Sequence, residues 1–575
     1  MWRRGPLGAG VLVIALVLSG CVGSAPRASE PASESAPPRP SVTKRVTLAM
    51  VTEPVALRSQ LSRSSAGSLP GSQELEQLVN AGLAILDHEG KLQPQLAETV
   101  PSVENGGWKV FPDGRMETVW KIRHGALWHD GQPVTAEDFV FTAMVAQDKD
   151  LAQFRNLAFD SVESVEAVNS TMVAILWSRP YIAADTLFAA FESVPVLAMP
   201  KHVLEAHYVQ NKNSFADLAY WSDEFIGTGP YRLKELARGN NLVLTAVPNY
   251  VLGKPAVDEI TVKFILDRSA LAASLLAGDI DMPVGNSLSF EEAMQLKDQW
   301  RDGTVEFRPT TTLKLWPQFR NPNPRVVADV RFRRAMLLAI DRQQMADSLS
   351  LGQSPVSDSS LSPVDPEYEA LKGSIVRYPY DPRAAAELLA ELGYRRGADD
   401  AWRDTAGQRL TIEARTVPRD ILIKSVLASV DDWKTLGIAV EPIVLTQQQR
   451  SDREFYATFP AFDAAGSNNG TSQFYAFHSS QAKTPENRYT GSNRSGYASA
   501  ELDRFIDRFY ATIPSTERMQ IAGRIVNYVT DQLVFLPLFY DLSPTLVGNR
   551  LMNVPRQLGR SATPTWNAQQ WDVKG

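Results

Sequence analysis

The sequence predicts an α/β fold made of two large and closely connected lobes. From Arg45 onward, short strand-like runs alternate with helical patterns, and this alternation is typical of α/β proteins. The 575 residues exceed the usual domain length of roughly 100–200 residues. No second long linker rich in Pro, Gly or Ser follows residue 45. The sequence therefore favours joined lobes over separate domains.

Local patterns predict the individual elements. Residues 46–50 are typical of a buried strand, and residues 116–122 alternate apolar and polar side chains as a half-buried strand does. Residues 162–177, with a turn at 169–170, predict a hairpin. Helix starts are predicted where capping residues precede apolar periodicity, at Ser72, Thr135, Asp381 and Ser499. The apolar face of the first helix is predicted to comprise Leu75, Leu78, Val79 and Leu83.

Composition and motifs exclude several classes of function. The net charge is −7 and no dense Lys/Arg stripe occurs, so we expect no nucleic-acid partner. Gly-x-Ser-x-Gly, His-Glu-x-x-His and phosphate-cradling Gly-x-x-x-x-Gly-Lys-Ser/Thr motifs are absent. His124, His129 and Asp130 lie in a predicted strand end and turn, which does not favour a metal site. We therefore expect no enzyme, no cofactor and no metal.

The N-terminal region predicts export and lipid anchoring. Arg3 and Arg4 precede a short apolar run, 7–18, which is shorter than the about 20 residues of a membrane-spanning helix. Residues 1–21 therefore indicate a signal peptide with a lipobox at Cys21, the only cysteine. Residues 22–44, rich in Ser, Ala and Pro, indicate a disordered tether. We expect an extracytoplasmic protein, in the periplasm or on the outer face, attached to the membrane through lipid on Cys21.

Collinear segments along most of the mature chain carry a resemblance to a known family. They are DHEGKLQPQLAE (87–98), WKIRHG (120–125), WHDGQPVTAED (128–138), GTGPY (227–231), NYVLGKP (249–255), LAGDID (276–281), DVRFRRA (329–335), AIDR (339–342), SGYASAELD (495–503) and FLPL (535–538). In this order they resemble the extracellular solute-binding proteins, family 5, of ABC importers, the peptide and nickel group. We interpret most of these segments as scaffold. Gly227 and Gly229 are expected to supply the positive φ of a tight turn before a strand.

The resemblance implies a fold and a mode of action. It implies the two-lobed periplasmic-binding-protein-like fold of the large peptide-binding class, type II, with a ligand cleft between the lobes. Lobe I would comprise 45–266 and 540–575, lobe II 267–539, with crossings near 266–268 and 537–539. It also implies a monomeric, extracytoplasmic component of an ABC importer, which captures peptides or similar-sized polar solutes by hinge closure and delivers them to a permease/ATPase complex.

Candidate ligand-binding residues concentrate in the loop-rich stretch 462–475, where family members line the cleft. Its polar and aromatic side chains suit a polar solute, and the candidates are Asp463, Ser467, Asn468, Asn469, Gln473 and Tyr475. Glu53, Asn493 and Trp402 are further candidates, Trp402 on a predicted loop. Trp316 and Trp433 are interpreted as core or interlobe packing.

One departure from the family pattern leaves the solute class open. Peptide-binding relatives carry an acidic residue after a Trp in this stretch, which pairs with the α-amino group of the ligand. Here the nearby carboxylate is Asp463, and if it points into the adjoining strand this loop offers no amine anchor. Glu53 is an alternative partner. An oligosaccharide, a glycoside or a metal chelate in the same fold, or a regulatory envelope lipoprotein without transport function, remain the alternatives.

Overall fold

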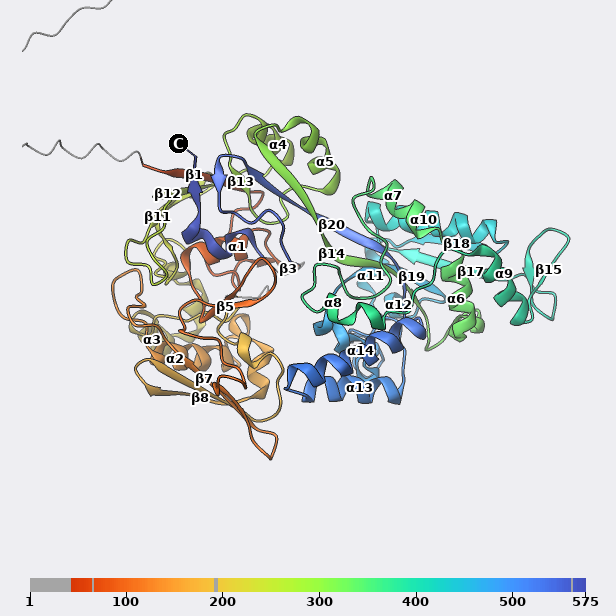
Figure 1. Cartoon of the computed structure of the whole chain (residues 1–575), viewed down its shortest axis with the longest axis horizontal. Coiled ribbons are helices and arrows are strands. Elements are labelled where there is room, and N and C mark those ends of the chain that lie inside the picture. Colours follow the sequence, from red (N-terminus) through yellow and green to blue (C-terminus); the bar gives the residue numbers. More distant parts are fainter. Residues whose placement is uncertain (1–42, 65–66, 191–194, 560–561, 575) are drawn as a thin grey trace, which may run out of the picture. The chain divides into compact units, whose positions relative to one another are not determined.

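Two α/β lobes make up the part of the chain that the structure describes (Figure 1). The structure is a computed structural model and describes residues 43–64, 67–190, 195–559 and 562–574. The predicted signal peptide, Cys21 and most of the predicted tether lie outside the described residues. No helix in the described ranges is long and apolar enough to cross a membrane.

The first lobe contains two sheets. A five-stranded mixed sheet has the order β10 (Tyr231–Ala237), β11 (Asn241–Ala246), β12 (Glu259–Phe264), β1 (Arg45–Met50) and β13 (Met282–Pro283). A four-stranded antiparallel sheet has the order β6 (Trp108–Val110), β7 (Met116–Lys121), β9 (Met172–Trp177) and β8 (Val162–Asn169). The helices of this lobe are α1 (Ser72–Val79), α2 (Ala136–Gln147), α3 (Lys201–Gln210), α4 (Arg268–Leu276) and α5 (Phe290–Gln299).

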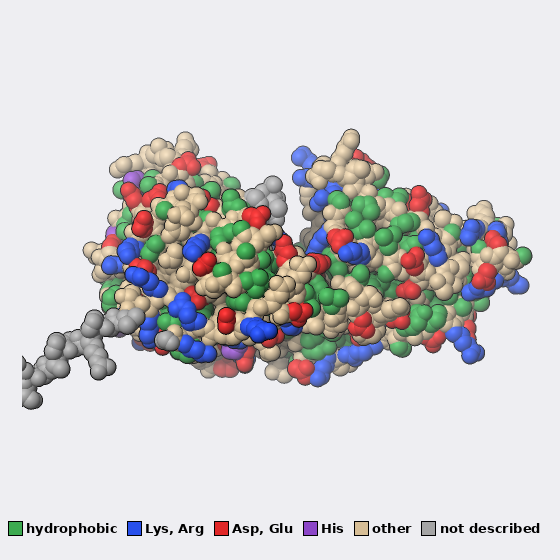
Figure 2. Space-filling model, turned by 90° about the horizontal axis from the view of Figure 1, so that it is seen from above, with side chains coloured by type: hydrophobic (Ala, Val, Ile, Leu, Met, Phe, Trp, Pro, Cys, Tyr) green, Lys and Arg blue, Asp and Glu red, His purple; other side chains and the backbone are tan. Residues whose placement is uncertain are grey.

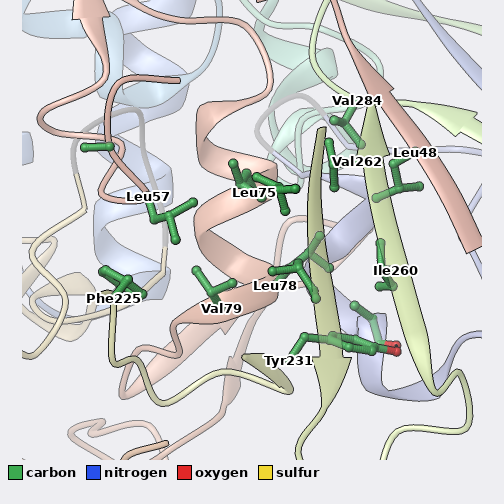
Figure 3. Close-up of a cluster of buried hydrophobic side chains, with 14 of the residues drawn as sticks. Leu48, Leu57, Leu75, Leu78, Val79, Phe225, Tyr231, Ile260, Val262 and Val284 are labelled. Carbon is green, nitrogen blue, oxygen red and sulfur yellow. The ribbon is translucent and has the colours of Figure 1, made fainter. Parts of the chain in front are cut away.

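Helix α1 packs its apolar stripe against the five-stranded sheet (Figure 3). Leu75, Leu78 and Val79 follow the i, i+3, i+4 spacing that places side chains on one helix face. They belong to the same buried cluster as Leu48 of β1 and Ile260 of β12. Because β1 and β12 pair in parallel, this cluster holds both central strands against the helix.

Most of the predicted elements are confirmed. The predicted strands correspond to β1 and β7, and the predicted hairpin to antiparallel β8 and β9. Thr135 and Asp138 form the capping box of α2, in which the Thr135 amide donates to Asp138 Oδ2 at 2.8 Å. The first helix is shorter than predicted, because it ends at Val79. Leu83 is buried in the loop that follows rather than on the helix.

The second lobe is built on one five-stranded mixed sheet. Its order is β18 (Ala439–Val444), β17 (Thr411–Thr416), β19 (Phe462–Asn468), β14 (Gly303–Pro317) and β20 (Leu536–Gly548). Its helices are α6 (Val330–Leu338), α7 (Arg342–Leu349), α8 (Tyr368–Leu371), α9 (Pro382–Glu391), α10 (Asp420–Thr435), α11 (Gln447–Ser451), α12 (Arg453–Ala457), α13 (Ala500–Ala511) and α14 (Ser515–Asp531). As predicted, Asp381 caps α9 and Ser499 caps α13. The short pairs β2–β3 (Arg63–Ser64, Gly67–Ser68), β4–β5 (Ala84–Leu86, Leu92–Pro94), β15–β16 (Arg395–Arg396, Trp402–Arg403) and β21–β22 (Leu551–Met552, Asp572–Val573) complete the strands.

The long antiparallel pair β14–β20 runs from one lobe into the other (Figure 1). At one end Val305 pairs with Leu546, and both pack with Ala49 in a cluster of the first lobe. At the other end Leu315 pairs with Leu536 in the core of the second lobe. The register shifts between Pro309 and Thr311, where proline has no amide to donate to the ladder.

The first crossing lies further along the chain than the predicted position near 266–268. Residues after 267 form α4 and α5, whose Leu271 and Leu296 pack with Ala49 of β1. Strand β13 then pairs with β1 through Met282 and Leu48. These contacts group residues 268–302 with the first lobe, because the apolar side chains of α4 and α5 are buried against β1. Strand β20, which returns toward the first lobe, begins at Leu536.

Gly227 and Gly229 serve close packing rather than a turn with positive φ. Neither has a φ in the left-handed region, but a Cβ on Gly227 would lie 1.9 Å from the carbonyl oxygen of Val79 at the end of α1. A Cβ on Gly229 would lie 2.5 Å from the amide nitrogen of Asn80. His129 accepts a hydrogen bond from the Gly227 amide and contacts the Gly229 carbonyl oxygen, and its burial lowers its pKa to about 4. This imidazole is thus used in packing two of the family-like segments together.

The surface carries both signs of charge. On the face shown in Figure 2, Lys and Arg side chains are interspersed with Asp and Glu. Within the described residues, no group of three or more His, Cys, Asp or Glu side chains is arranged to hold a metal ion.

The glycine contacts lead to a stability prediction. Gly229→Ala should lower the free energy of unfolding by about 1–3 kcal/mol, because the added methyl group must displace the backbone at the end of α1. Gly373→Ala is the matched control, since a Cβ there meets nothing within 4 Å. Urea denaturation followed by circular dichroism measures both. Equal midpoints for the two variants would contradict the close-packing role.

Candidate functional site

A pocket of about 220 Å³ opens in the second lobe beside β14 and β19. Residues from both strands, from the 3₁₀ helix η8 (Thr471–Phe477) and from the following loops surround it. Its lining comprises Lys314, Trp316, Gly466, Ser467, Asn468, Gln473, Ala476, Phe477, Lys483, Gly491, Ser492 and Arg494. The pocket thus combines hydroxyl, amide and cationic side chains with two aromatic rings, a lining that suits a polar solute.

The alternation of β-strands explains how this lining arises. Leu313 and Leu315 of β14 face the core of the second lobe. The intervening Lys314 and Trp316 therefore point to the opposite face of the sheet. Residues paired across antiparallel strands share a face, and Lys314 is paired with Ala465 and Trp316 with Asp463. One sheet face consequently carries a polar and cationic patch in place of a fully apolar one.

Lys314 is the most unusual residue of the pocket. Its side chain is almost completely buried, at 1% exposure, and its Nζ donates to Ser467 Oγ at 2.5 Å. The same Nζ lies 4.3 Å from the ring centroid of Phe535 and 5.5 Å from that of Trp316, within cation–π range. Within the described residues it forms no ion pair with a carboxylate, and burial lowers its pKa to about 7.

Asp463 does not belong to the pocket lining. It is fully buried and forms an ion pair with Arg494, whose guanidinium also donates to the Tyr456 hydroxyl. Arg415 on the neighbouring β17 is paired with Asp463 in the strand register and adds a second positive charge nearby. Arg494 engages Oδ2 of the carboxylate, while Oδ1 is buried without a hydrogen-bond partner among the described residues. An α-amino group bound at Oδ2 would have to displace that ion pair.

The pocket brings together three of the nine candidate residues, Ser467, Asn468 and Gln473. Asn469 is buried instead and accepts from Thr312 Oγ1 at 2.6 Å. Asn493 is buried and donates to the carbonyl oxygen of Tyr497 at 2.8 Å. These two amides hold the loops around the pocket in place, because they satisfy backbone or strand groups that would otherwise be buried without partners.

The remaining three candidates lie away from the pocket lining. Tyr475 is 46% exposed and stacks on His478. Trp402, predicted on a loop that faces the ligand, begins β16 and is buried in the core of the second lobe, where its indole donates to the Leu436 carbonyl at 2.7 Å. Glu53, in the first lobe, accepts from the Gly239 amide at 2.9 Å.

Sequence reasoning missed six polar or aromatic residues of the pocket: Lys314, Trp316, Phe477, Lys483, Ser492 and Arg494. The signal for the first two was present in the run Leu313-Lys314-Leu315-Trp316, where a lysine interrupts a strand that is otherwise buried. Strand alternation predicts that such a lysine shares a face with Trp316. Lys483 and Arg494 lie on loops, for which no sequence period indicates a direction.

The buried lysine leads to a prediction about pH. Between about pH 7 and the ordinary lysine pKa of 10.5, the unfolded chain binds a proton that folded Lys314 lacks. The free energy of unfolding should therefore rise with pH in this window, by up to about 1.4 kcal/mol per pH unit from this residue. Lys314→Met should remove this rise and stabilise the protein most at the lower pH values.

Urea denaturation at intervals from pH 6.5 to 9.5 measures this effect. Lys424→Met is the matched control, because Lys424 is 51% exposed and pairs only with Asp420 one helical turn away. The control should keep the slope of the unchanged protein. An equal slope for Lys314→Met and the control would mean that Lys314 keeps an ordinary lysine pKa in the folded protein.

Comparison with known proteins identifies the family of this chain. The model of the bacterial extracellular solute-binding proteins, family 5 Middle, matches residues 91–486. The oligopeptide-binding protein AppA of Bacillus subtilis is 25% identical over 511 residues, which cover 86% of each chain. Two solved structures are also similar. One is the oligopeptide-binding protein of Thermus thermophilus complexed with a pentapeptide, at a TM-score of 0.64 and 22% identity.

The other is NikZ from Campylobacter jejuni in complex with Ni(L-His), at a TM-score of 0.65 and 21% identity. The matches cover 92% of this chain in both cases, and 96% and 99% of the respective structures. At this level of identity the structures share the fold, while their ligands differ in chemistry. Because the family model spans more than half of the chain, the chain belongs to the bacterial extracellular solute-binding proteins of family 5.

Proposed function

We propose that this protein is the extracytoplasmic solute-binding component of an ABC importer and captures a peptide or a similar-sized polar solute. The observation that carries the proposal is the polar pocket on one face of the β14–β19 pair, next to the strands that connect the lobes. The similar proteins support it, since AppA is named an oligopeptide-binding protein and relatives from Brucella are named putative ABC transporter peptide-binding proteins. On this proposal the protein binds its solute without converting it, so it is not an enzyme and has no cofactor.

Capture by hinge closure is part of this proposal. The β14–β20 ladder is the continuous strand pair shared by the lobes, and its register shifts twice, at Pro309/Thr311 and at Thr312/Lys314. Irregular positions of this kind absorb backbone rotation more easily than a regular ladder. Lys314 lies at the second shift and lines the pocket. A rotation of the backbone in the β14–β20 ladder would therefore move a side chain that contacts the solute.

The carboxylates near the pocket bear on the class of solute that it binds. With Asp463 held by Arg494, the second lobe provides no free carboxylate for an α-amino group among the residues that line the pocket. Glu53 remains a proposed partner from the first lobe, although its carboxylate accepts from Gly239 and lies 3.8 Å from Arg238. A solute held mainly by hydroxyl, amide and cationic groups fits the pocket better than one anchored by its amine.

A screen for thermal stabilisation tests solute capture. Trialanine, maltotriose and Ni(L-His) serve as probes of a peptide, an oligosaccharide and a metal chelate. A solute at a hundredfold excess over its dissociation constant stabilises the protein by about 2.7 kcal/mol, which raises the melting temperature. Gln473→Trp should abolish the shift because the larger side chain fills the pocket.

Gln448→Trp is the matched control on α11, where Gln448 is exposed and remote from the pocket lining. It should keep the full shift. If representatives of all three classes leave the melting temperature unchanged, the proposal of solute capture is refuted and a regulatory lipoprotein becomes the better account. If Gln473→Trp retains the shift, solutes bind elsewhere on the protein.

Lipid attachment at Cys21 is proposed together with this function. Several acyl chains anchor a protein firmly, since each buried methylene contributes about 0.8 kcal/mol. Cys21→Ser should therefore move the protein from the membrane fraction to the soluble fraction of the host cell, as measured by immunoblotting after ultracentrifugation. Ser24→Ala is the control and should remain with the membrane. Membrane association of the Cys21→Ser protein would refute the anchor.

A further inference from the structure

The charges that line the pocket are all of one sign. Lys314, Lys483 and Arg494 contribute side chains, whereas no Asp or Glu belongs to the lining. The carboxylate in contact with Arg494 is that of Asp463, which is buried and forms an ion pair with it. Lys314 and Lys483 are therefore not compensated by a carboxylate of the lining. With Lys483, and with Lys314 when it is protonated, the pocket presents an excess of positive charge to whatever enters it.

Lys314 is in an energetically unfavourable environment as it stands. A buried ammonium without a counter-ion loses much of its hydration, and proteins normally pair such a charge. An ammonium has three donor positions, and its hydrogen bond to Ser467 uses one of them. The rings of Phe535 and Trp316 stabilise the cation only in part. An incoming anion would supply the missing charge and further acceptors.

A second donor in the pocket also lacks a partner. The indole Nε1 of Trp316 is buried and has no hydrogen-bond partner among the described residues. This group can only donate, so it requires an acceptor such as a carboxylate or phosphate oxygen. Trp316 and Lys314 lie two residues apart on the same face of β14 and line the same pocket. Two donors without sufficient acceptors thus occur side by side.

We infer that this pocket binds an anionic group of the transported solute, with the Lys314 ammonium as its counter-charge and the Trp316 indole N–H as a second donor. The inference rests on the proposed function and adds the chemical class of the solute. A carboxylate, as in the C-terminus of a peptide or in a sugar acid, and a phosphate share the required anionic oxygens. A free amine is disfavoured because it would face Lys314, Lys483 and Arg494.

Matched pairs of probes that differ only in charge test this inference. The pairs are trialanine and trialanine amide, galacturonic acid and galactose, and glucose 6-phosphate and glucose. Isothermal titration calorimetry measures each dissociation constant with the full-length mature protein. In at least one pair the anionic member should bind at least about tenfold more tightly than its neutral partner, as expected for a buried charge pair. The pair that shows this preference identifies a peptide, a sugar acid or a phosphate as the source of the charge.

The Lys314→Met variant locates the preference. It should reduce the ratio between anionic and neutral member to about one, while Lys424→Met, which changes an exposed lysine on α10, should leave the ratio unchanged. The comparison of probes in the unchanged protein does not depend on the folding of any variant. Circular dichroism checks that Lys314→Met is folded.

The outcomes separate this inference from the proposed function. If neutral probes bind as tightly as anionic ones, or if the preference persists in Lys314→Met, the inference fails while solute capture stands. If no probe of either charge binds, and the screen with trialanine, maltotriose and Ni(L-His) is also negative, both fail together. Preference for an anionic probe that Lys314→Met removes supports both.

Discussion

The antiparallel pairing of β14 with β20 is the constraint on which the arrangement of this protein depends. The ladder begins in the first lobe, where Val305 and Leu546 pack against Ala49, and ends in the sheet of the second lobe. Each strand is therefore a structural member of both lobes. Because β19 pairs with the second-lobe half of β14, the position of the pocket follows from this ladder. A disturbance of the ladder would change the pocket and the connection of the lobes together.

The same strand carries the contrast that defines the pocket. Leu313 and Leu315 enter the apolar core of the second lobe, while Lys314 and Trp316 face the opposite side. A soluble protein normally fills a buried strand face with apolar side chains, since a buried ammonium destabilises the fold unless it is paired. The lowered pKa of Lys314 reflects this cost of burying its ammonium group. Ionisable residues with strongly shifted pKa values concentrate at functional sites.

The electrostatics around Asp463 bear on the question that the departure from the family pattern left open. Peptide-binding relatives carry an acidic residue for the α-amino group in this stretch, whereas here Asp463 is held by Arg494 and flanked by Arg415. The pocket next to it is positive rather than negative. A shared fold does not by itself decide which solute is bound, because function depends on the chemistry of the site that the fold carries. The charge of the lining is part of that chemistry.

The sequence by itself determined the local elements and the family. The capping pair Thr135 and Asp138, the strand alternation in β7 and the proline at the start of α9 depend on neighbours within a few residues, so they were predictable. It also predicted six ligand-binding residues in the stretch 462–475, of which Ser467, Asn468 and Gln473 line the pocket.

Only the tertiary structure decided which side chains meet across the fold. The ion pair of Asp463 with Arg494 joins residues 31 positions apart, and the packing of Gly227 against Val79 joins segments that no local pattern connects. The grouping of α4 and α5 with the first lobe likewise depends on contacts with β1. Local periodicity fixes the direction of a side chain relative to its own strand or helix, but burial and pairing depend on strands and loops brought together from distant parts of the chain.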